Sequence, residues 1–180
     1  MNEYQRKAVL AKLIGEMEES KSWCGETHIQ KTVYFLTELF PGDLNLEFIL
    51  YKHGPFSFDL RDVLTEMRAD DLIDWRVKHA SYGASCESRP MAKELIRKFA
   101  ATVGEWDGRL QFVARCVSSG TVLELERLAT ALFILRKEEL SEGEVPKRLV
   151  ELKPHVNLDD ARHAVSEVLD IEREAAAIAG

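Results

Sequence analysis

The sequence predicts an α+β protein that is mostly α-helical, with a small β-sheet or hairpin in its N-terminal part. Apolar residues recur at three- and four-residue spacing through most of the 180 residues. Short stretches rich in strand-forming residues occur only before residue 90. We therefore expect a winged-helix-like part over residues 1–90 and a helical part over residues 91–180 that packs on it, within one compact unit.

Two helices are expected at the start of the chain. Apolar residues at helical spacing predict the first over residues 3–18. The second is predicted to begin at Thr27, because Thr27 and Gln30 are spaced as a capping box, and to end before Pro41.

The next elements are a strand, a third helix and a hairpin. Residues 44–51 read as a strand, and Ser57 is a suitable N-cap for the third helix. Residues 72–78 and 85–89 are expected to pair as a two-stranded hairpin. The order departs from the usual winged helix, because a strand separates the second and third helices where a tight turn is expected.

Everything after residue 90 is predicted to be helical. Residues 92–103 show the cleanest amphipathic pattern of the chain, and a further helix is expected over residues 108–117. Thr121 opens a capping box with Glu124 before a long apolar helix. Pro146 suits the first turn of a short helix, and Asn157 is the expected N-cap of the last one.

Composition and charge exclude several classes of protein. A hydrophobic fraction of 46% with 31% charged residues is typical of globular chains rather than disordered ones. The net charge of −7 opposes unspecific binding to phosphate backbones. No apolar run approaches the ~20 residues of a membrane span, and residues 1–7 do not resemble a signal peptide, so we expect a cytoplasmic protein without membrane contact.

The sequence offers no catalytic motif and no ligand set for a metal or cofactor. The three cysteines are an odd number without meaningful spacing, which argues against a disulfide framework. Cys24 and His28 could lie on one helical turn, but a structural zinc site needs a second pair of ligands, and none follows. We therefore expect no enzymatic activity, no metal and no cofactor.

Residues 28–36 (HIQKTVYFL) resemble the "LQK" helix of YwgA-like proteins and of the related Panacea (SocA-like antitoxin) domain. Residues 51–57 (YKHGPFS) resemble the "YGPFS" corner of the same proteins, and residues 152–154 (LKP) resemble a motif before their final helix. The sequence departs from these family motifs at Ile29, His53 and Asp71. The resemblance implies a bacterial or archaeal family whose relatives include antitoxins that bind a partner protein and sometimes help deliver it to proteolysis.

The candidate binding site combines two of these segments. Because Gly54 precedes Pro55, the chain is expected to turn a rigid corner there, beside one side of the second helix. In the alternative interpretation Tyr34 and Phe56 are core residues and Gln30 only caps its helix. The residues proposed to form a partner-binding surface are Gln30, Lys31, Tyr34, His53, Gly54, Pro55 and Phe56.

A second candidate site is a basic segment. Residues 75–99 hold six basic residues against two acidic ones. Arg76, Lys78 and Arg89 fall on the predicted hairpin, where they could contact nucleic acid as a basic wing. A solvated basic face is the alternative, and the third helix carries more acidic than basic residues.

These observations favour a non-enzymatic protein-interaction or regulatory module of antitoxin type. Its partner would be another protein, such as a toxin or a regulatory protein. A homodimer is a further assembly that the sequence allows. The alternative function is a winged-helix transcriptional regulator that contacts DNA through the basic wing. An enzyme with an unrecognised site is the third.

Overall fold

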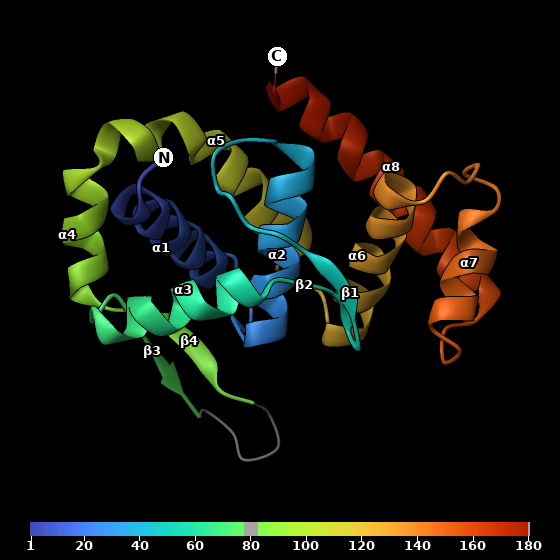
Figure 1. The fold of residues 1–180 in the computed structure, drawn as a ribbon, viewed down its shortest axis with the longest axis horizontal. Coiled ribbons are helices and arrows are strands. Elements are labelled where there is room, and N and C mark those ends of the chain that lie inside the picture. Colours follow the sequence, from blue (N-terminus) through green and yellow to red (C-terminus); the bar gives the residue numbers. More distant parts are fainter. Residues whose placement is uncertain (78–82, 180) are drawn as a thin grey trace.

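The computed structural model describes residues 1–77 and 83–179 and shows an α+β fold that is mostly helical, which confirms the predicted class. The strands form two separate antiparallel pairs, β1 with β2 and β3 with β4. The elements in chain order (Figure 1) are α1 (Glu3–Glu19), α2 (Glu26–Leu39), β1 (Ile49–Tyr51), β2 (Gly54–Phe56), α3 (Phe58–Ala69), β3 (Ile73–Arg76), β4 (Ser85–Ser88), α4 (Pro90–Lys98), α5 (Ala100–Val117), α6 (Val122–Lys137), α7 (Val145–Leu152) and α8 (Leu158–Ala179).

Helix α2 lies in the middle of the molecule, with α1 and α4 on one side and α6, α7 and α8 on the other (Figure 1). It packs on α5 and α6, while α1 packs on α4 and α5, and α6 packs on α7 and α8. The contacts of α1 and α2 with α5 and α6 join parts of the chain before and after residue 90. A domain boundary near that residue stays a prediction.

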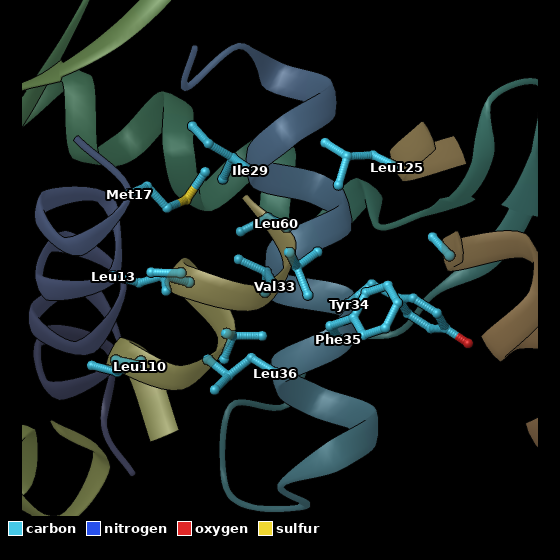
Figure 2. Packing of buried hydrophobic residues seen from close by; sticks show 14 of the residues in the cluster. Leu13, Met17, Ile29, Val33, Tyr34, Phe35, Leu36, Leu60, Leu110 and Leu125 are labelled. Atoms are coloured by element: carbon cyan, nitrogen blue, oxygen red, sulfur yellow. The ribbon is translucent and has the colours of Figure 1, made fainter. Parts of the chain in front are cut away.

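The hydrophobic core surrounds α2. Figure 2 shows buried side chains of this core, among them Val33 of α2, Leu13 of α1, Leu60 of α3 and Leu110 of α5. Tyr34 is fully buried, and its ring centroid lies 5.1 Å from that of Phe48. Aromatic rings at this distance add to the stabilisation from burial.

Several short-range sequence signals are confirmed. The Ser57 hydroxyl accepts a hydrogen bond from the Leu60 N–H at 3.1 Å, which caps α3. Thr121 forms the predicted capping box with Glu124 at the start of α6. Asp71 has a φ of 55°, a left-handed conformation that aspartate adopts more readily than most residues. Each of these signals acts between residues that are close together in the chain, so it can be recognised from the sequence alone.

Several predicted boundaries are wrong. The N-cap of α2 is Gly25 rather than Thr27, and the helix begins at Glu26. The strand expected over residues 44–51 is only Ile49–Tyr51, since β2 offers just three residues to pair with it. The helix expected over residues 92–103 ends at Lys98. The helix expected over residues 108–117 is α5, which starts at Ala100 after a turn at Phe99. Apolar periodicity reports which faces are buried and not where the helix axis changes direction.

The predicted hairpin is present, and β3 pairs with β4 from Ile73 opposite Ser88 to Arg76 opposite Ser85. Among the helices of the described residues, none is long and apolar enough to cross a lipid bilayer.

Candidate functional site

The β1–β2 hairpin forms the corner that the Gly-Pro sequence predicts. Gly54 has a φ of +82°, a conformation that glycine adopts without strain. A Cβ atom at Gly54 would lie 3.0 Å from Thr130 Oγ1 and 3.4 Å from the carbonyl oxygen of Glu126, both on α6. The backbone of the hairpin therefore approaches α6 as closely as it does because residue 54 has no side chain.

Two buried side chains of α2 hold the corner from the other side. Lys31 Nζ donates a 2.7 Å hydrogen bond to the carbonyl oxygen of Pro55. Gln30 binds the backbone of Ser57 through both ends of its amide. Buried amide and ammonium groups need such partners, because an unpaired polar group in the interior costs free energy. The corner is consequently fixed to both α2 and α6.

A buried charged cluster lies under the hairpin. Lys153 Nζ contacts Glu126 Oε1 and donates a hydrogen bond to the carbonyl oxygen of Lys52, and both of the paired side chains are buried. His53 Nδ1 lies 3.5 Å from Glu126 Oε2, but most of the His53 side chain is exposed. Lys31 is fully buried close to this pair. The cluster thus sets two buried lysines against one buried glutamate.

The ionisation of the cluster follows from burial and from its charges. Desolvation lowers the pKa of Lys31 to about 8, the charge of Glu126 raises it in part, and the charge of Lys153 lowers it further. Desolvation raises the pKa of Glu126, but its hydrogen bond and ion pair with Lys153 lower that pKa by more in total. Glu126 is therefore ionised at neutral pH, and Lys31 carries its proton less firmly than an ordinary lysine.

The structure divides the predicted partner-binding residues between interior and surface. Gln30, Lys31 and Tyr34 are buried, so the prediction that their side chains form an accessible surface is wrong. Tyr34 belongs to the hydrophobic core, as the alternative interpretation of the sequence states. Gln30 binds the backbone of the corner instead of capping its helix. The pair Gly54-Pro55 is also buried, Phe56 is half-buried and His53 is exposed.

The exposed part of the corner is aromatic. The ring of Phe56 lies 5.9 Å from that of Tyr51 and 5.1 Å from that of Phe58, and the rings of Tyr51 and Phe58 are 5.8 Å apart. Tyr51 is 49% exposed, Phe58 is 41% exposed and Ile49 is 50% exposed. Ile49 pairs directly with Phe56, and it lies two residues from Tyr51, so the three side chains share one face of the hairpin. We call Ile49, Tyr51, Phe56 and Phe58 the aromatic face.

Sequence reasoning missed three of these four residues. The alternation of Ile49 and Tyr51 along a strand was available as a signal for a shared face. The exposure of these two side chains could not be predicted from the sequence, because it depends on how the hairpin lies against α6. The Arg61 guanidinium carbon lies 5.0 Å from the centroid of the Phe58 ring and adds a cation–π contact at the edge of the face.

The outer edge of β1 is open for pairing. Pro55 has no N–H, so the Leu50–Pro55 pair lies at a position without hydrogen bonds, and the N–H and C=O of Leu50 point away from β2. In the part of the chain that the structure describes, this sheet has two strands only, and no third strand covers Leu50. An open edge beside apolar side chains is a site where another chain can add a strand.

The basic hairpin is largely neutralised by its own acidic residues. Arg76 Nη2 lies 3.1 Å from Asp74 Oδ2, and Arg89 Nε lies 3.2 Å from Asp71 Oδ1. Lys78 lies outside the described residues. The two arginines therefore do not form a free cationic surface of the kind that attracts a phosphate backbone.

No group of three or more histidine, cysteine, aspartate and glutamate side chains within residues 1–77 and 83–179 is placed to hold a metal ion. No protein-family model matches the sequence, and no curated protein matches it significantly.

Proposed function

We propose that the protein is a non-enzymatic protein-interaction module whose partner binds the aromatic face. The observation that carries this proposal is the exposure of Ile49, Tyr51 and Phe58 on one rigid corner. Exposed aromatic side chains on a preorganised support are the usual anchors of protein interfaces, because they bury a large apolar area with little loss of conformational entropy.

The support under the face favours the same proposal. Gln30, Lys31 and Glu126 are buried, and they fix the β1–β2 hairpin of eight residues between α2 and α6. Rigidity reduces the entropy that is lost when a partner binds. The open edge of β1 at Leu50 would let that partner contribute an extended segment beside the aromatic face.

The antitoxin type of this module rests on the resemblance to YwgA-like and Panacea-domain proteins, which is the reason to propose a toxin or a regulatory protein as partner. The winged-helix likeness of residues 1–90 is a proposal as well. It is supported by the β3–β4 hairpin that follows α3, while the β1–β2 hairpin between α2 and α3 departs from that fold.

The test is direct binding to a defined candidate. The products of the genes that flank the gene of this protein are purified, and each is titrated into the chain by calorimetry. We expect one of them to bind with a Kd of about 1 μM or tighter. Failure of both flanking products to bind would contradict the antitoxin type.

A further inference from the structure

The chain that leads into β1 is extended beyond the three residues that pair with β2. Over residues 45–51, exposed and half-buried side chains alternate. This period of two is the pattern of a β-strand with one face covered. Phe48 is half-buried, and its ring packs on that of Tyr34 in the core. The exposed residues of the row include Glu47, Ile49 and Tyr51. We call residues 47–51 the β1 edge.

The space beside the β1 edge is open. A hollow of about 400 Å³ lies against residues 45–49, between the last turns of α2 and the end of α6. Its lining includes the exposed Pro41 and Ile49 and the half-buried Leu46 and Phe48. Ile49 therefore belongs to the hollow and to the aromatic face at once. A chain that lies along the edge can continue from one to the other.

Leu50 offers backbone groups to such a chain. Its N–H and C=O point away from β2, and no hydrogen bond within the described residues uses them. An antiparallel segment can place one residue opposite Leu50 and exchange two hydrogen bonds with it. The residues before and after that one then lie opposite Tyr51 and Ile49. Because directly opposite residues share a face, both of their side chains join the aromatic face.

The two ends of the edge carry opposite charges. Glu47 lies at the start of the edge, Lys52 follows Tyr51 at the tip of the hairpin, and both are exposed. Glu38 pairs with Lys137 beside the hollow, but no ion pair within the described residues includes Glu47 or Lys52. Opposite charges across a strand pair are stabilising, and like charges are destabilising. The edge therefore favours a segment with an acidic residue at Lys52 and a basic one at Glu47.

We propose that the partner's segment adds to the β1 edge as an antiparallel strand with the residue order acidic, apolar, any, apolar, any, basic. The acidic residue lies opposite Lys52 and the basic one opposite Glu47. The two apolar residues lie beside Tyr51 and Ile49, and the residue between them pairs with Leu50. This assignment rests on the proposed function, because it describes the segment through which the partner binds.

The test uses synthetic peptides and does not need the partner. The hexapeptide EVTVTK, acetylated and amidated at its ends, has the proposed order. KVTVTE has the same composition with the two charges exchanged and is the matched control. Each peptide is titrated into the isotope-labelled full chain, and the backbone amide signals are followed by NMR.

We expect EVTVTK to bind saturably, with a Kd of about 1 mM or below, and to shift the amide signals of residues 47–51 most. KVTVTE places like charges opposite Glu47 and Lys52, so it should bind at least about fivefold more weakly. No saturable binding of EVTVTK, or equal affinity for the two peptides, would overturn the proposal.

Exchange of the charges on the edge should exchange the preference. Glu47→Lys/Lys52→Glu changes two exposed side chains, so the fold should be retained, and this variant should bind KVTVTE more tightly than EVTVTK. Glu142→Lys/Lys147→Glu exchanges two exposed charges near the start of α7 and should keep the preference of the wild type. An edge variant that still prefers EVTVTK would contradict the assignment.

Methylation of the peptide backbone tests the strand geometry. A methyl group on the nitrogen of the first threonine removes the N–H that donates to the carbonyl oxygen of Leu50, so binding should weaken at least about tenfold. The N–H of the following valine points away from β1, and its methylation should weaken binding by less than about threefold. Equal losses would show that the peptide does not bind as a strand, and would overturn the proposal.

Failure of this assignment differs from failure of the proposed function. If EVTVTK does not bind while Tyr51→Ala/Phe58→Ala weakens binding of the partner protein, the aromatic face stands and the strand assignment is wrong. If EVTVTK binds as described while that double variant binds the partner as the wild type does, the strand site stands and the proposed function is wrong.

Discussion

Gln30 and Ser57 exchange two hydrogen bonds across 27 residues of sequence: the Ser57 N–H donates to Gln30 Oε1, and Gln30 Nε2 donates to the carbonyl oxygen of Ser57, each at 2.9 Å. Both residues are fully buried. This pairing joins α2 to the start of α3 directly after the corner. The orientation of the aromatic face depends on it.

Replacement of Gln30 by Leu should therefore destabilise the fold. The variant leaves the N–H and C=O of Ser57 buried without a partner, which should lower the free energy of unfolding by about 2 to 4 kcal/mol. Urea denaturation measures the difference. Gln111→Leu is the control, since Gln111 is exposed on α5 and should change stability by no more than about 0.5 kcal/mol. Equal effects of the two changes would show that the pairing does not support the corner.

Gly54 should tolerate no side chain. Gly54→Ala places a methyl group 3.0 Å from Thr130 Oγ1 at a positive φ, and we expect a loss of about 2 kcal/mol or more. Gly15→Ala is the matched control, because Gly15 lies within α1 with open space around it. There alanine should stabilise by about 0.5 to 1 kcal/mol. A Gly54→Ala protein as stable as the wild type in urea would refute the close approach to α6.

How far the sequence predicts this molecule depends on the range of each signal. Ser57 and Thr121 act within a few residues of their own position, and the structure confirms both. The spacing of Gln30 from Thr27 imitates a capping box, but the Gln30 amide binds the backbone of Ser57, the N-cap of another helix.

The charged cluster could not be predicted at all. Lys31, Glu126 and Lys153 come from three helical regions far apart in the chain, and each alone reads as an ordinary surface residue. Likewise the exposure of Tyr51 and Phe58 could not be predicted, since sequence shows that a residue is apolar and not which elements cover it. The corner was predictable, but the side that faces solvent was not.

Lys31 should make stability depend on pH. Its folded pKa of about 8 is below the ordinary 10.5, so between these values the unfolded chain binds a proton that the folded protein lacks. The free energy of unfolding should then rise with pH, by about 2 kcal/mol between pH 7.5 and 9.5, relative to a Lys31→Met variant. The difference between the two proteins removes the contributions of other groups. Parallel stability curves would contradict a partly deprotonated Lys31.

The basic hairpin should not confer specific DNA binding. Arg76 and Arg89 are paired with aspartates, and the chain carries a net charge of −7. A mobility-shift assay at about 150 mM salt, with the DNA upstream of its own gene, should show no complex that survives competitor DNA. Nanomolar, competitor-resistant binding that Arg76→Glu abolishes would instead support the transcriptional regulator.

The central claim is that the aromatic face carries partner binding, and the most direct measurement compares Tyr51→Ala/Phe58→Ala with Tyr4→Ala by calorimetry against the bound flanking-gene product. Tyr4 is 57% exposed on α1, far from the corner in sequence, and serves as the control. We predict that the double variant, with its free energy of unfolding within about 1 kcal/mol of the wild type, binds at least about 100-fold more weakly, while Tyr4→Ala binds as the wild type does. Unchanged affinity of the folded double variant would contradict the claim.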